Sequence, residues 1–215
     1  MVCLIIAGGT ISPDQLKTTY DRISDDALVL TADRGTLHAI SAGIPIDRAI
    51  GDFDSVDGSE LALIKEKLPD KVEKLIPEKD DTDTEHALRY AFEHNPSEII
   101  MMGCTGTRLD QTINSIFLLR ECADRGIPAF IIDSTNRIRI SKGTTQIKKE
   151  NLFGKYISIL PLEKEAHIKT ISGFKYDVTD ITLSQSSGRG ISNELVEEEG
   201  IIESDDHIII IESID

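Results

Sequence analysis

The chain reads Arg48-Ala49-Ile50-Gly51-Asp52-Phe53-Asp54-Ser55 where a short apolar run ends in two carboxylates. If the run is a β-strand, Asp52 and Asp54 leave the same side of it. They then stand near its carboxyl end, where open α/β sheets bind their ligands. Two anions this close repel one another, and a divalent cation such as Mg²⁺ relieves the repulsion. Asp and Ser are also common turn residues, so the pair alone is compatible with a simple turn.

The segments around this stretch alternate between strand and helix patterns. The continuous apolar run at 2–7 is typical of a strand that is buried on both faces of a sheet. A second, largely apolar run lies at 27–32, and we predict a further strand at 98–102. Helical patterns follow them, and one begins with a capping box formed by Thr82 and Glu85. The connecting loops are short, so we predict a doubly wound α/β domain with a parallel sheet.

The pattern changes near Asn136. From there the chain contains short runs rich in β-branched residues, among them 137–140, 145–148, 156–160 and 207–211, most of them separated by Gly, Asn, Asp or Ser. Such runs without a helical period are typical of a small antiparallel sandwich or barrel. We therefore predict two domains, over residues 1–136 and 137–215.

Composition narrows the class of protein. The formal net charge of −15 argues against a nucleic-acid binder, because that affinity comes largely from Lys and Arg side chains. No apolar stretch is long enough to span a bilayer, so we expect no membrane partner. The three cysteines are far apart and odd in number, which indicates a reducing compartment and a cytoplasmic location.

Acidic residues recur at the expected ends of strands in the first domain. Because the carboxyl ends of parallel strands share one edge, these side chains should meet in a single cleft. Two of them have structural explanations, since Asp83 suits the first turn of a helix and Asp110 suits an N-cap. Their mutual repulsion nevertheless favours a cation site. The set comprises Asp33, Asp52, Asp54, Asp80, Asp83 and Asp110.

The segment 103–110 supplies a complementary loop. Its two glycines allow the backbone to approach a ligand, and the following helix offers free N–H groups at its N-terminus. Arg108 can bind phosphate oxygens with its planar guanidinium group. The spacing matches neither a Walker A loop nor the dinucleotide fingerprint.

Taken together, these stretches resemble the motifs of the thiamine pyrophosphokinase family, in the family's order and over nearly the whole chain. Two positions depart from the pattern, because Arg34 stands where the family usually has Gly and Gln111 stands where it usually has His. Some members set a Trp against thiamine, and this chain has none. The corresponding stretches are Ala32-Asp33-Arg34-Gly35, Gly51-Asp52-Phe53-Asp54-Ser55, Lys79-Asp80-Asp81-Thr82-Asp83, the segment 103–111 with Asn114, and Gly190-Ile191-Ser192-Asn193-Glu194.

The resemblance implies a Rossmann-like N-terminal domain, a C-terminal β-sandwich and a homodimer with active sites at the subunit interface. It implies transfer of a diphosphate from ATP to the hydroxyethyl group of thiamine, with Mg²⁺ as cofactor, giving thiamine diphosphate and AMP. The implied metal ligands are Asp52, Asp54 and Asp83. The implied ATP-binding residues are Asp33, Thr82, Arg108, Asp110 and Asn114. The implied substrate-binding residues are Asp80, Ser192 and Asn193.

Three of these residues are expected to be catalytic, namely Asp54, Asp110 and Arg108. Arg108 would neutralise phosphate charge, and either Asp54 or Asp110 could accept the proton of the attacking hydroxyl. Two other functions stay open. One is diphosphate transfer to a pterin-type hydroxymethyl acceptor, and the other is a non-catalytic sensor of Mg²⁺ and nucleotide.

Overall fold

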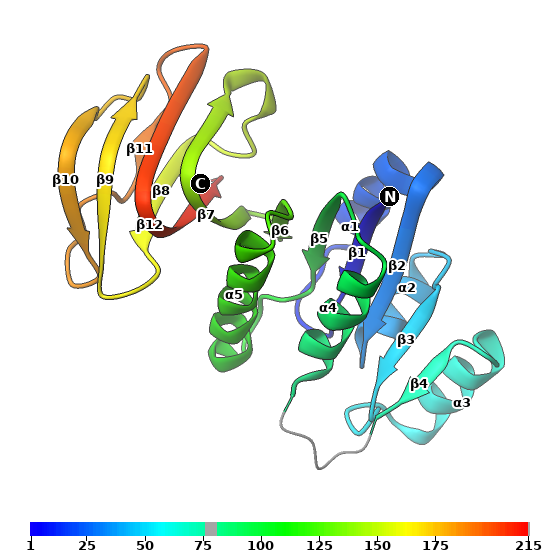
Figure 1. Cartoon of the computed structure of the whole chain (residues 1–215). Helices are drawn as coiled ribbons and strands as arrows, with labels where there is room; N and C mark the ends of the chain where they lie inside the picture. The colour runs from blue at the N-terminus through cyan, green and yellow to red at the C-terminus, as the bar shows by residue number, and fades with distance from the viewer. Residues whose placement is uncertain (76–80, 215) are drawn as a thin grey trace. The chain divides into compact units, whose positions relative to one another are not determined.

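The computed structural model describes residues 1–75 and 81–214, and it divides into two compact units (Figure 1). Unit 1 consists of Met1–Leu118 and Ile127–Ser134. Unit 2 consists of residues 119–126 and the chain from Thr135 onward. Asp80, one of the predicted substrate-binding residues, lies outside the described residues.

Unit 1 is built on a parallel sheet, as the apolar runs predict. The strand order is β6-β5-β1-β2-β3-β4, and each neighbouring pair is parallel. The chain moves from β1 outward to β4 and then returns to β5 on the other side of β1, so the order reverses there. The strands are β1 (Val2–Ile6), β2 (Ala27–Ala32), β3 (Arg48–Gly51), β4 (Val72–Lys74), β5 (Glu98–Met102) and β6 (Ala129–Ile132).

Helices connect these strands, and local capping fixes where two of them begin. The Asp57 side chain accepts hydrogen bonds from Ser59 and Glu60 at the start of α3, and the Glu60 side chain completes the capping box. The Thr82 hydroxyl accepts a hydrogen bond from the Glu85 N–H at 3.2 Å at the start of α4. The helices are α1 (Pro13–Ile23), α2 (Gly35–Ser41), α3 (Gly58–Lys67), α4 (Asp83–Glu93) and α5 (Leu109–Asp124), with a 3₁₀ turn at Ser24–Asp26.

Unit 2 is an antiparallel β structure, which confirms the predicted mixed architecture. Its long last strand, β12, joins its parts: 201–204 pair with β9, whereas 208–213 pair with β8, and the register shifts between them. Its apolar core includes Ile157, Ile159, Ile168 and Ile202, all fully buried. The strands are β7 (Asn136–Lys148), β8 (Tyr156–Pro161), β9 (Glu165–Ser172), β10 (Val178–Ser184), β11 (Asn193–Glu194) and β12 (Glu199–Ser213), with a 3₁₀ turn at Lys149–Asn151.

Several element boundaries differ from the sequence prediction. The runs 137–140 and 145–148 belong to one strand, β7, because Gly143 adopts a φ of +80° and the strand continues through it. The run 207–211 is only part of β12. The sequence suits Asp110 to an N-cap, but the residue lies in the first turn of α5. None of the helices in the described part of the chain is long and apolar enough to cross a membrane.

Candidate active site

A cavity of about 510 Å³ opens at the carboxyl edge of the parallel sheet, and all of its lining residues belong to unit 1. The loops after β1, β2, β3 and β5 form its walls, together with the start of α4 and the first turns of α5. This is the edge of the strand reversal, where doubly wound sheets bind ligands. The lining segments lie within 7–10, 32–34, 52–55, 81–84, 103–108 and 111–115.

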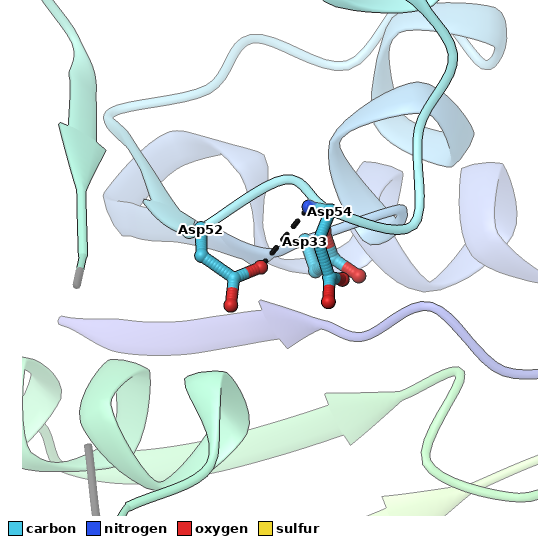
Figure 2. Close-up of side chains that lie close together, drawn as sticks. All are labelled: Asp33, Asp52 and Asp54. Atoms are coloured by element: carbon cyan, nitrogen blue, oxygen red, sulfur yellow. Dashed lines mark hydrogen bonds between the residues drawn. The ribbon is translucent and has the colours of Figure 1, made fainter. Parts of the chain in front are cut away.

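Three carboxylates meet in this cavity. Asp33, Asp52 and Asp54 each place one oxygen so that all three oxygens lie within 4.8 Å of one another (Figure 2). The Asp33 Oδ1 atom is buried and has no hydrogen-bond partner among the described residues. Carboxylate oxygens are the ligands that Mg²⁺ prefers, so the donor set and the unsatisfied oxygen both fit a hard divalent cation.

Two left-handed backbone positions shape this cluster. Asp33 has a φ of 48° and Phe53 a φ of 58°, a conformation that bulky residues rarely adopt. The Phe53 ring is 4% exposed and packs in the hydrophobic core. The Asp54 N–H donates a hydrogen bond to the Asp52 carboxylate at 3.0 Å (Figure 2). The buried ring therefore anchors a turn that brings the acids on either side of it together.

The cluster is electrostatically unfavourable when no cation is bound. Burial raises the pKa of Asp33, and the negative charges of Asp83 and Asp52 raise it further. A hydrogen bond from the Ser55 hydroxyl opposes this shift but does not cancel it. Asp83 therefore lies close enough to act on the cluster, and it also lines the cavity. A bound cation would relieve the repulsion among these groups.

Glycine loops form another part of the cavity wall. The Gly9 N–H donates to the Gly103 carbonyl at 2.7 Å, and the Thr10 N–H donates to the Thr105 carbonyl at 2.8 Å. A Cβ atom on Gly9 would lie 2.4 Å from each of those two carbonyl oxygens. The loop after β1 can therefore lie against the loop after β5 only because residue 9 has no side chain.

The sequence patterns did not identify the loop after β1 as a functional segment. Gly8, Gly9 and Thr10 all line the cavity, although none of them is among the residues predicted for the site. His38 of α2 forms hydrogen bonds with the backbone of Gly9 and Gly8, and burial lowers its pKa. The Gly-Gly pair after a buried strand was the signal that could have identified this loop.

Arg108 is held by a neighbouring carboxylate. Its Nη2 donates to Asp110 Oδ2 at 2.5 Å, and its Nε donates to Asp110 Oδ1 at 3.2 Å. The pair is exposed, and the guanidinium lowers the pKa of Asp110. Arg108 lines the cavity together with Thr82 and Gln111. Asn114 is partly buried on α5 and is not one of the lining residues identified in the described chain.

The two remaining predicted residues lie in unit 2. Ser192 has a φ of 57°, and its N–H donates to the Ser158 hydroxyl at 3.0 Å. Asn193 is 5% exposed, and its side-chain amide accepts from the Tyr176 N–H and donates to the Tyr176 carbonyl, both at 3.0 Å. Its amide therefore holds the backbone near Tyr176 in place.

These features define a class of protein. A doubly wound α/β domain with an acidic cluster and glycine loops at its strand reversal belongs to the α/β proteins whose ligand site lies at this edge of the sheet.

Comparison with known proteins identifies the family within this class. Residues 20–131 match the model of the thiamin pyrophosphokinase catalytic domain, and residues 144–209 match that of the thiamin pyrophosphokinase vitamin B1 binding domain. The thiamine pyrophosphokinase of Bacillus subtilis (strain 168) is 34% identical over 198 residues, covering 91% of this chain and 90% of the relative. The chain therefore belongs to the thiamine pyrophosphokinase family and is an enzyme, as its motifs predict.

Solved structures agree with this assignment. The crystal structure of thiamine pyrophosphokinase from Bacillus subtilis has 32% sequence identity and a TM-score of 0.89, with 100% of both chains covered. That of thiamin pyrophosphokinase from Geobacillus thermodenitrificans has 32% identity and a TM-score of 0.88, covering 100% of this chain and 98% of the other. The yeast thiamin pyrophosphokinase, at 19% identity and a TM-score of 0.83, shares the fold.

Proposed function

We propose that this enzyme transfers a diphosphate from ATP to the hydroxyethyl group of thiamine, producing thiamine diphosphate and AMP. The observation that carries the proposal is the meeting of Asp33, Asp52 and Asp54 in one cavity, with a buried Asp33 oxygen that lacks a partner among the described residues. Family membership supports the choice of thiamine as acceptor.

In this proposal Asp33, Asp52 and Asp54 hold Mg²⁺, and Asp83 adds negative charge beside them. The sequence motifs suggested Asp83 as the third ligand, but the carboxylate separations favour Asp33. When bound, Mg²⁺ would neutralise phosphate charge on ATP. By holding that cation the carboxylates would set where the triphosphate lies in the cavity, and positioning is the main requirement of phosphoryl-type transfer.

The other groups that line the cavity would bind the phosphates. The glycine loops bring the backbone close to the cavity, and Asp110 orients the Arg108 guanidinium toward developing negative charge. The thiamine hydroxyl oxygen attacks the β-phosphorus, the bond between that phosphorus and the α–β bridging oxygen breaks, and AMP leaves. Asp54 and Asp110 are the candidate acceptors of the hydroxyl proton, and the Arg108 guanidinium lowers the pKa of Asp110, which weakens it as a base.

Thiamine is a cation, so an acidic cavity would attract it. The family resemblance further suggests that Ser192 and Asn193 contact thiamine in the active site of the partner subunit of a homodimer. The homodimer, the thiamine contacts of these two residues and a cytoplasmic location stay predictions.

Product analysis with two acceptors tests the proposal. The enzyme is incubated with ATP and Mg²⁺, with thiamine, with 6-hydroxymethylpterin or with no acceptor, and AMP and the diphosphate ester are quantified. We expect AMP and thiamine diphosphate in equal amounts, and little AMP without thiamine. AMP formed only with the pterin would overturn the assignment of the acceptor. Nucleotide binding without AMP under every condition would instead indicate a sensor.

A further inference from the structure

Arg34 occupies an unusual place beside the acidic cluster. It follows Asp33 directly at the start of α2, and it lines the cavity although its side chain is half exposed. A Cβ atom on Gly8 would lie 3.1 Å from the Arg34 Cβ, so the base of this side chain packs close to the loop after β1. Its guanidinium group turns instead toward the loop after β3.

The guanidinium group contacts two residues that follow Asp54 in the chain, Ser55 and Glu60. Its Nη1 donates to the Ser55 carbonyl at 3.1 Å, and its Nη2 lies 3.5 Å from the Glu60 carboxylate. Glu60 also accepts a hydrogen bond from the Asp57 N–H at 2.9 Å and so belongs to the cap of α3. Arg34 therefore connects the turn after β3 to the first turn of the next helix.

The preceding residue holds the same turn from another direction. The Ser55 hydroxyl donates a hydrogen bond to the Asp33 carboxylate. Consecutive residues, Asp33 and Arg34, thus bind Ser55 through its side chain and its backbone carbonyl. The turn they hold contains Phe53 at a φ of 58°, a conformation that persists only when surrounding contacts stabilise it.

We propose that Arg34 is a positioning residue that fixes the turn 51–55 so that Asp52 and Asp54 share a cation with Asp33. This inference rests on the proposed function of the acidic cluster. Both terminal nitrogens of the guanidinium group contact the protein, at Ser55 and Glu60. Arg34 therefore acts through the turn and its backbone.

Loss of the Arg34 charge and loss of its contacts with the turn should change metal binding in opposite directions. The proposal is therefore testable. Removing a nearby positive charge would by itself tighten the binding of a cation. Removing a group that orients the ligands weakens binding, by about tenfold or more for residues that support metal ligands. The sign of the change therefore distinguishes the two roles.

The experiment titrates the nucleotide-free protein with Mn²⁺ and follows the free ion by electron paramagnetic resonance. We expect Arg34→Met to weaken Mn²⁺ binding by about tenfold. Arg34→Lys should also weaken Mn²⁺ binding several-fold, because one ammonium group cannot contact Ser55 and Glu60 in the way that the planar guanidinium group does. Arg125→Met in unit 2 removes the same charge and should leave the affinity unchanged. Unchanged or tighter binding in Arg34→Met would overturn the proposal.

Two further measurements complete the test. Circular dichroism establishes that each variant is folded. If Arg34→Met does not fold, Arg34→Lys tests the proposal in its place. Unchanged Mn²⁺ affinity in Arg34→Lys would refute a positioning role for the guanidinium group. In the assay of AMP formation, Arg34→Met should need more Mg²⁺ for half-maximal rate but recover to within about threefold of the wild-type rate at saturation. Wild-type Mn²⁺ affinity in Asp54→Asn would refute the metal site itself, independently of Arg34.

Discussion

The Ser55 hydroxyl donates a hydrogen bond to the Asp33 carboxylate and so ties the loop after β3 to the loop after β2. The other Asp33 oxygen is buried and lacks a hydrogen-bond partner in the described part of the chain. One oxygen is therefore used to order the site, and the second is left for a ligand.

Replacing Asp33 by Asn should stabilise the metal-free protein at neutral pH. The amide oxygen can still accept from Ser55, while the repulsion from Asp52 and Asp83 is removed. We expect the Tm to rise by roughly 2–4 °C, as is common when a functional carboxylate is neutralised. Added Mg²⁺ should raise the Tm of the wild type more than that of the variant. Scanning fluorimetry with and without Mg²⁺ measures both effects.

The difference in Tm between the wild type and Asp33→Asn should also depend on pH, and the direction of this dependence can be predicted. Because the pKa of Asp33 in the fold is raised above its ordinary value of 3.8, the folded state takes up the proton at a higher pH than the unfolded chain. Lowering the pH through this interval stabilises the wild type relative to Asp33→Asn. The Tm advantage of the variant should therefore shrink from neutral pH toward pH 3.8. An advantage that grows on acidification would contradict the assigned shift.

Replacing Gly9 by Ala should damage the wall of the cavity. The added methyl group would lie 2.4 Å from two backbone carbonyl oxygens, of Gly103 and Thr105, and neither can move as freely as a side chain. Overpacking of this kind costs about 1–3 kcal/mol. Gly58→Ala is the matched control, because a Cβ there meets no described atom within 4 Å. Denaturant unfolding measures the stabilities of Gly9→Ala and Gly58→Ala. Equal stabilities would argue against a close approach of the loops after β1 and β5.

Replacing Arg108 by Met should reduce catalysis and leave stability unchanged. The side chain is 70% exposed, so the fold does not depend on it. If it stabilises charge in the transition state, kcat/KM for ATP should fall by about 100-fold or more. Asp110→Asn, which removes only the orienting charge, should cause a smaller loss. A full rate in Arg108→Met would exclude Arg108 from the reaction.

Unit 2 contains a buried ion pair whose loss should be costly. Glu212 is 1% exposed, accepts from Arg137 at 2.6 and 3.0 Å, and also accepts from the Phe153 N–H at 3.1 Å. Glu212→Ala leaves these donors without that partner and should destabilise the protein by about 3–5 kcal/mol. Glu121→Ala breaks an exposed pair and should cost less than about 1 kcal/mol. Urea unfolding of both variants checks the difference.

The sequence was informative about the fold because burial imposes a pattern. The buried run at β1 and the β-branched runs after Asn136 both reflect packing, so they predicted the parallel sheet and the antiparallel strands. The boundaries inside β7 and β12 could not be predicted. They depend on Gly143, which continues the strand at positive φ instead of ending it, and on a register shift that residue types do not reveal.

The candidate site was predictable only in part. Convergence of Asp33, Asp52 and Asp54 follows from the shared edge of parallel strands. Their separations depend on the left-handed turns at Asp33 and Phe53, which the pattern does not reveal, so the sequence could not show that the oxygens of Asp33, Asp52 and Asp54 lie within 4.8 Å of one another. The loop at Gly9 was missed because its role comes from the adjacency of β1 and β5, which are far apart in the chain.

The rate of AMP formation from ATP, with and without thiamine, in the wild type and in Asp54→Asn, tests the central claim most directly. Asp70→Asn, at an exposed turn, is the matched control. We expect thiamine-dependent AMP formation in the wild type and the control, and a rate lower by roughly three or more orders of magnitude in folded Asp54→Asn. Wild-type activity in Asp54→Asn would contradict a catalytic cation held by the three carboxylates.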